Sequence, residues 1–198
     1  MKELFRTRSY EMVRMFLNQF ATSVFGLVLA IAAGRAENPV LRNVTSVCAI
    51  LFYLFLLYTM TWELGFADRA AVVSGRKPKK PFTGALLSVC ANAINWLLAV
   101  FILLGNLLPD VTFFSGLGGF AGTAAHLLEG MYTGLLANRV GGNPLNSYWF
   151  VYFLLPIPAI VISGVAYLFG LKDLKFTGLF NVQYPESDRE PKKPKKKK

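Results

Sequence analysis

The chain has 198 residues, of which 54% are hydrophobic and 16% are charged, and its formal net charge is +10. Most of the basic residues flank long uncharged stretches, so the charge indicates how the chain lies in a membrane before it indicates a partner. The sequence has neither a nucleic-acid-binding motif nor interleaved basic and aromatic residues, which excludes nucleic acid as the expected partner.

Four uncharged stretches are each long enough for a membrane-spanning helix. They contain 20 residues between Arg14 and Arg35, 20 between Arg42 and Glu63, 29 between Lys80 and Asp110, and 32 between Arg139 and Lys172. An α-helix needs about 20 apolar residues to cross a hydrocarbon layer about 30 Å thick. These lengths predict an all-α, polytopic membrane protein.

The membrane domain is expected to be a four-transmembrane-helix bundle over residues 14–170. Its spans are expected at about 14–34, 44–62, 83–108 and 148–170, with an external segment at 109–147. A cytoplasmic flank (1–13) precedes the bundle, and a cytoplasmic lysine-rich tail (171–198) follows it.

The basic residues predict the orientation of these spans. Alternate flanks and loops place 18 basic residues on one side and 3 on the other, and cytoplasmic loops collect Lys and Arg. Both termini are therefore expected in the cytoplasm, with the protein in the cell membrane. A further span over 111–136 would break this division, so we reject it. Lys195 and Lys196 formally fit a dilysine retrieval pattern, which leaves the endoplasmic reticulum membrane as an alternative.

The first span could be mistaken for a signal peptide, because the small residues 30–33 resemble a cleavage site after an apolar run. Glu3 and Glu11 in the flank, and Asn18 and Gln19 at the start of the run, favour an uncleaved helix. Cleavage is the alternative, and it would leave three spans with the other orientations unchanged.

Polar residues mark one face of the first span and one face of the third. Asn18 and Gln19 lie on the first of these faces, and Ser88, Asn92 and Asn95 lie on the second. An amide in hydrocarbon must find a partner, and hydrogen bonds between helices are common in membrane bundles. We expect interhelical polar contacts here, with a polar pathway or binding site as the alternative. No charged residue is expected at mid-depth in a span, which argues against a proton or ion relay.

The helical pattern of the second span continues beyond the membrane to Val73, where Ser74 and Gly75 predict its end. The basic linker that follows is expected to contact anionic lipids, as is the tail. These candidate contacts are Arg76, Lys77, Lys79, Lys80, Lys192, Lys193, Lys195, Lys196, Lys197 and Lys198. The tail is rich in Pro, Lys and acidic residues and is expected to be disordered.

The external segment contains four glycines between 116 and 122, which predict a flexible stretch. Over 124–138 the apolar residues share one half of a helical wheel, which predicts an amphipathic or re-entrant helix on the outer face. His126 and Glu129 could supply two metal ligands, but a site needs three or four. We therefore expect a polar surface there and no metal.

Pro156 and Pro158 lie in the outer half of the last span. Each proline removes a backbone donor and clashes with the preceding turn, so we expect a helix break near 153–157. The carbonyls freed in this way must be satisfied by neighbours, water or a ligand. A hinge or binding function is the alternative to a purely structural break.

The sequence has no catalytic constellation and indicates no cofactor, so we do not expect an enzyme. A minor alternative is an enzyme that uses His126 and Glu129. The expected function is a non-catalytic integral membrane component, such as an accessory subunit, assembly factor or scaffold. It would act as a homo-oligomer or with a membrane protein partner. A small transporter or channel subunit that acts as an oligomer is the alternative, supported by the asparagine face and the proline break.

Overall fold

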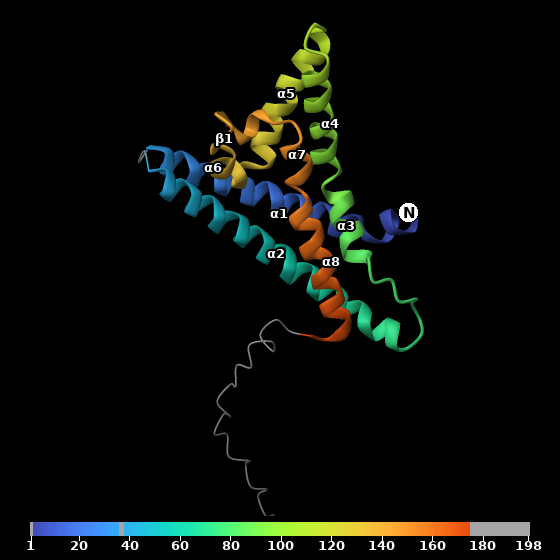
Figure 1. The fold of residues 1–198 in the computed structure, drawn as a ribbon. Coiled ribbons are helices and arrows are strands. Elements are labelled where there is room, and N and C mark those ends of the chain that lie inside the picture. The colour runs from blue at the N-terminus through green and yellow to red at the C-terminus, as the bar shows by residue number, and fades with distance from the viewer. Residues whose placement is uncertain (1, 36–37, 175–198) are drawn as a thin grey trace, which may run out of the picture.

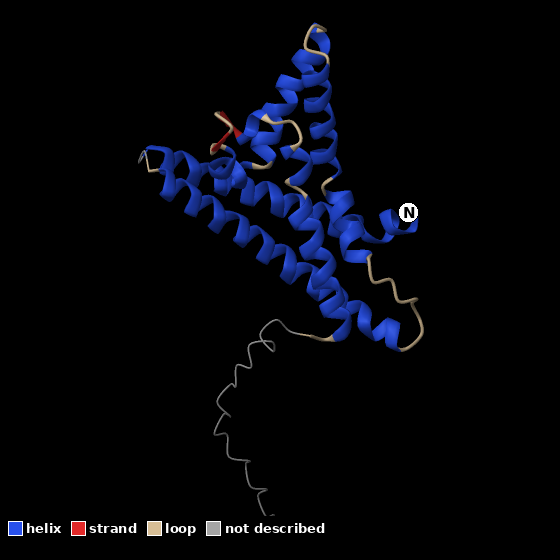
Figure 2. Cartoon of the chain, in the orientation of Figure 1, coloured by secondary structure: helices blue, strands red, loops and turns tan. Residues whose placement is uncertain are grey.

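Helices make up 81% of the computed structural model, which describes residues 2–35 and 38–174. The elements in chain order are α1 (Lys2–Arg35), α2 (Pro39–Val73), α3 (Thr83–Ala91), α4 (Ala93–Leu107), α5 (Thr112–Leu128), η1 (Gly130–Tyr132), α6 (Thr133–Leu136), β1 (Arg139–Val140), β2 (Asn143–Pro144), η2 (Leu145–Ser147), α7 (Val151–Leu154) and α8 (Ile157–Lys172). The two strands pair as a short antiparallel hairpin near α6 (Figure 2). The lipid contacts expected at 192–198, and most of the tail expected to be disordered, lie outside the described residues.

Within the described residues, three helices are long and apolar enough to cross a membrane: Arg6–Arg35, Pro39–Val73 and Val151–Lys172. The bent pair formed by α3 and α4 would be a fourth span. The structure therefore contains the long apolar helices that the uncharged stretches predict.

The helices α1 and α2 form a long antiparallel pair of 34 and 35 residues (Figure 1). α2 begins where the Asn38 side-chain oxygen accepts hydrogen bonds from the backbone N–H groups of Val40 and Leu41, at 3.0 and 3.2 Å. Such a cap satisfies donors that have no partner within the helix. α2 continues to Val73, as its pattern predicts, and Gly75 with a φ of 70° then turns the chain.

The end of the bundle at which α1 begins and α2 ends is here called the basic end, because it carries Arg6, Arg8, Lys77, Lys79 and Lys80. α8 returns the chain to this end and lies against α2 and α3. Glycines make the contacts close: a Cβ on Gly65 would overlap the carbonyl oxygen of Tyr167, and one on Gly84 would overlap that of Ser163. Small residues at helix contacts are typical of membrane bundles, where they let backbones approach.

The last span is interrupted at its prolines. α7 ends at Leu154 and α8 begins at Ile157, so Pro156 lies in the break. The hydroxyl of Tyr132 donates a hydrogen bond to the carbonyl oxygen of Leu155 at 3.3 Å. A side chain from η1 therefore satisfies one of the carbonyls at the break.

The third span differs from the expected continuous helix over 83–108, because it bends by 52° at Asn92 between α3 and α4. The Asn92 side chain donates to the carbonyl oxygen of Ser88, four residues earlier, at 2.9 Å. A side chain that bonds this carbonyl competes with the helix backbone and bends the helix. α4 consequently leaves α8 and pairs with α5 in a hairpin that projects from the bundle (Figure 1).

The expected flexible stretch at 116–122 is also wrong, because these glycines lie inside the helix α5. A Cβ on Gly105 of α4 would lie 2.8 Å from the Cα of Gly118, so these two glycines bring the helices together. The helix expected over 124–138 is broken instead: α5 ends at Leu128, and Glu129 has a φ of −113° and a ψ of 25°. For the glycines at 116–122, packing of α5 against α4 outweighs the low helix propensity of glycine.

Candidate functional site

The break at Glu129 turns the chain into the groove between α1 and α2, where Glu129 is buried. The side-chain amide of Gln19 donates to the Oε1 atom of Glu129 and to the carbonyl oxygen of Leu128, both at 3.3 Å. The hydroxyl of Ser23 also donates to Leu128. Burial raises the pKa of the Glu129 carboxyl to about 8. The prediction that Glu129 lies on an exposed polar surface is therefore wrong, because the helix ends before this residue and its side chain is buried.

The three polar residues of the third span bond mainly to one another. Asn92 donates to Ser88, and Asn95 donates to the side-chain oxygen of Asn92 at 2.9 Å. The side-chain oxygen of Asn95 has no hydrogen-bond partner among the described residues, although Asn95 is buried. On α1, Asn18 contacts the sulfur of Met60 at 3.8 Å.

The structure therefore places the predicted polar residues in two groups. Gln19 faces the segment at Leu128 and Glu129, while Ser88, Asn92 and Asn95 form a chain of contacts along α3 and α4.

His126 and Glu129 are not brought together. The Nε2 atom of His126 lies 3.3 Å from the hydroxyl of Tyr152 and 3.5 Å from the side-chain nitrogen of Asn146. Across residues 2–35 and 38–174, no group of three or more His, Cys, Asp or Glu side chains could hold a metal ion.

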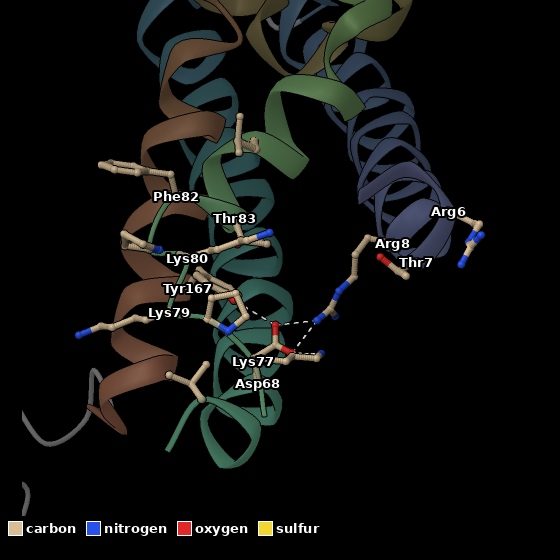
Figure 3. A pocket seen from close by; sticks show the side chains of 14 residues that line it. Arg6, Thr7, Arg8, Asp68, Lys77, Lys79, Lys80, Phe82, Thr83 and Tyr167 are labelled. Carbon is tan, nitrogen blue, oxygen red and sulfur yellow. Dashed lines mark hydrogen bonds and ion pairs between the residues drawn. The ribbon is translucent and has the colours of Figure 1, made fainter. Parts of the chain in front are cut away.

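A second group of polar residues lies at the basic end, around Asp68. The carboxylate of Asp68 accepts hydrogen bonds from Arg8 at 2.6 Å, from Lys77 at 3.0 Å and from the hydroxyl of Tyr167 at 3.0 Å (Figure 3). Asp68 is 7% exposed and Tyr167 is 3% exposed, so this carboxylate joins three helices and the linker out of contact with most of the solvent. A buried carboxylate requires such paired cations and donors.

A cavity of about 750 Å³ opens beside Asp68, between the start of α1, the linker and the start of α3 (Figure 3). Five basic side chains and one acidic side chain contribute to its lining, which also includes exposed apolar residues. We call it the basic pocket; the lining residues used below are Arg6, Arg8, Asp68, Lys77, Lys79, Lys80, Phe82 and Leu86.

The pairing of Asp68 with Arg8, Lys77 and Tyr167 was not predicted from the sequence. A signal for it was present, because Leu57, Thr61, Leu64 and Asp68 follow helical spacing on the buried face of α2. An acidic residue that continues a buried face beyond the apolar run indicates an internal partner. Arg76, by contrast, lies outside the basic pocket and donates to the hydroxyl of Ser74 at 2.9 Å.

Comparisons with protein-family models, with curated proteins and with solved structures find no match to this chain. The geometry of its own residues therefore carries the functional argument.

Proposed function

We propose that this protein is a non-catalytic integral membrane component, an accessory subunit, assembly factor or scaffold, that works within a larger membrane assembly. It would associate with further copies of itself or with another membrane protein. The observation that carries this proposal is the face that the α4–α5 hairpin leaves open.

The outward side of α5 carries three glycines beside the exposed side chains of Phe113 and Phe120. A Cβ added at Gly116, Gly119 or Gly122 would meet no atom within 4 Å. The long helices α1 and α2 expose large apolar side chains such as Val28 and Phe55, which suit a lipid environment, without such a row of glycines. Small residues are typical of helix contacts within membranes, so the open face of α5 suits a partner helix better than lipid.

The proposed orientation places the basic end on the cytoplasmic side of the cell membrane, with both termini on that side. It is supported by the 18 basic residues on one side of the spans against 3 on the other, because basic loops are retained in the cytoplasm.

We expect Gly119→Leu to disrupt the assembly. A Cβ added at Gly119 meets no atom within 4 Å and the residue is exposed, so we expect the fold to tolerate the larger side chain. At a close helix contact the same side chain would weaken association by about tenfold or more. The test is the mass of the complex that purifies from membranes in a mild detergent, by light scattering, with its co-purifying proteins identified.

Gly34→Leu is the matched control, because Gly34 of α1 also has no atom within 4 Å of an added Cβ. The proposal predicts that this variant keeps the assembly of the wild-type protein. A wild-type protein that purifies as a single chain without a partner, or two variants with equal behaviour, would contradict it.

A second candidate function is a small transporter or channel subunit that acts as an oligomer. Two observations favour it: the buried carboxyl of Glu129, and the side-chain oxygen of buried Asn95, which has no hydrogen-bond partner among the described residues. Ionisable groups buried in membrane bundles often belong to ion or proton pathways. A Glu129→Gln variant that retained full biological function would argue against this candidate.

A further inference from the structure

We propose that the basic pocket binds the phosphate-bearing headgroup of an anionic phospholipid, with the lipid's apolar part lying against Phe82 and Leu86. This inference rests on the proposed membrane location but not on the proposed assembly. It concerns one built site and therefore differs from the general attraction of a basic surface to anionic membranes.

The charge of the pocket is strongly positive once its internal pairs are counted. Asp68 is held by Arg8 and Lys77, so its negative charge is already neutralised. The remaining basic lining residues, Arg6, Lys79 and Lys80, form no ion pair within the described part of the chain. Cations without partners around a cavity favour an anionic ligand.

The pocket has two opposing walls that are held in place. Arg6 comes from α1, whereas Lys80 comes from the linker before α3. The contacts of Asp68 with Arg8 and with Lys77 connect these two segments (Figure 3). A fixed spacing between the two backbone segments that carry the cations reduces the conformational entropy lost on binding. Lys79 and Arg6 both extend away from Asp68, on opposite sides (Figure 3), so we place both at the rim.

An apolar wall distinguishes a lipid from a free phosphate. Phe82 is 70% exposed and Leu86 is 42% exposed, and both line the cavity beside the cations. A free phosphate ion has no apolar part to cover these side chains, whereas the glycerol and acyl region of a phospholipid does. Basic pockets at the cytoplasmic ends of membrane helices recognise anionic headgroups, which are enriched in that leaflet.

The test measures lipid binding to the full chain by native mass spectrometry in a neutral detergent. Phosphatidylglycerol is compared with phosphatidylcholine of the same acyl chains. We expect the wild-type protein to retain one phosphatidylglycerol at least about tenfold more tightly than phosphatidylcholine, since the positive choline opposes the cations. The pocket variant is Arg6→Gln/Lys80→Gln, which removes one cation from each wall and should weaken phosphatidylglycerol binding by about thirtyfold.

The matched control is Arg14→Gln/Arg76→Gln, which also removes one cation from α1 and one from the linker. Arg76 is a lipid contact expected from the sequence, but its side chain lies outside the pocket and donates to Ser74. Neither Arg14 nor Arg76 lines the pocket, so binding should stay within about twofold of the wild-type value. Equal losses of affinity for phosphatidylglycerol in the two variants would mean that general surface charge, and not the pocket, binds the lipid. That result would overturn the proposal. Equal affinity for the two lipids would also overturn it.

A third arm adds inorganic phosphate at about 10 mM, well above the concentration of lipid. We expect no displacement of phosphatidylglycerol, and displacement would assign the pocket to a soluble anion instead. Thermal unfolding checks that each variant is folded. If the double variant does not fold, Lys80→Gln alone is judged by the same criteria, because Lys80 is exposed and forms no ion pair within the described residues.

Discussion

Glu129 and Asp68 are both buried acidic residues, but different groups face them. Asp68 faces two cations and a phenol, which stabilise its charged form. Glu129 faces the neutral amide of Gln19, and no ion pair to Glu129 occurs among the described residues. Desolvation therefore acts on Glu129 without compensation, and the neutral carboxylic acid is favoured in the folded protein.

The pKa of Glu129 predicts how stability changes with pH. Its folded value of about 8 exceeds the ordinary value of 4.5, so the folded protein holds a proton that the unfolded chain releases. Stability from this group is complete below about pH 4.5 and is lost as the pH rises toward 8, by at most about 1.4 kcal/mol per pH unit. Glu129→Gln should flatten this part of the profile, measured by thermal unfolding between pH 5 and 9.

Tyr132→Phe is the control, because it keeps the buried environment near Glu129 and removes only the hydrogen bond to Leu155. It should lower stability by about 1 kcal/mol at every pH. A Glu129→Gln profile with the same slope as the wild-type profile would show that Glu129 is not the group that titrates.

At the scale of the elements, glycine has opposite effects at different positions. Gly65 of α2 lies where an added Cβ would overlap the backbone of α8. Gly116 of α5 lies where an added Cβ would meet nothing within 4 Å. The same substitution therefore tests a packed helix contact at one position and only helix propensity at the other.

Gly65→Ala should lower the free energy of unfolding by about 1–3 kcal/mol, because a backbone carbonyl cannot move aside as a side chain can. Gly116→Ala should raise the stability of the single chain by about 0.5–1 kcal/mol through helix propensity. Thermal unfolding in detergent measures both changes. A Gly65→Ala variant that is as stable as the wild-type protein, or more stable, would mean that α2 and α8 do not pack as closely as the structure shows.

The sequence predicts the long helices well, because an uncharged run of sufficient length and a terminating Gly75 are local signals. It does not predict the bend at Asn92 or the helix α5, since these depend on contacts between segments. The glycines of α5 favour a flexible stretch by propensity alone, and only the fit of Gly118 against Gly105 makes them helical. The position of Glu129 follows from the same break and could not be read from a helical wheel.

At the scale of the whole molecule, the chain begins and the described part ends at the basic end. Arg8 near the start of α1 and Asp173 after α8 contact the same helix, through Asp68 and Arg69 respectively. Four membrane spans, with α3 and α4 counted together as one, would place both of these ends on the same side of a membrane. The orientation of that arrangement is a separate prediction.

We expect cysteines at positions 115 and 143 to react with a membrane-impermeant thiol reagent added outside cells, and a cysteine at position 78 to remain unlabelled. The variants are Ser115→Cys, Asn143→Cys and Pro78→Cys, made after the free cysteines Cys48 and Cys90 are replaced by alanine. The reason is the retention of basic segments in the cytoplasm. Permeabilised cells provide the control, since position 78 should then react. Labelling of 78 alone in intact cells would reverse the orientation.

The contacts of Asp68 also have a consequence for synthesis of the chain. A ribosome completes α1 and α2 well before Tyr167, so Asp68 can meet Arg8 early but must wait for α8 to receive its buried hydroxyl. The close contacts of Gly65 and Gly84 with α8 are completed at the same late moment. A nascent chain lacking α8 would therefore leave Asp68 without its tyrosine donor and would leave Gly65 and Gly84 without their helix contacts. Packing of α8 therefore completes the contacts of Asp68, Gly65 and Gly84, and a chain without α8 lacks all three.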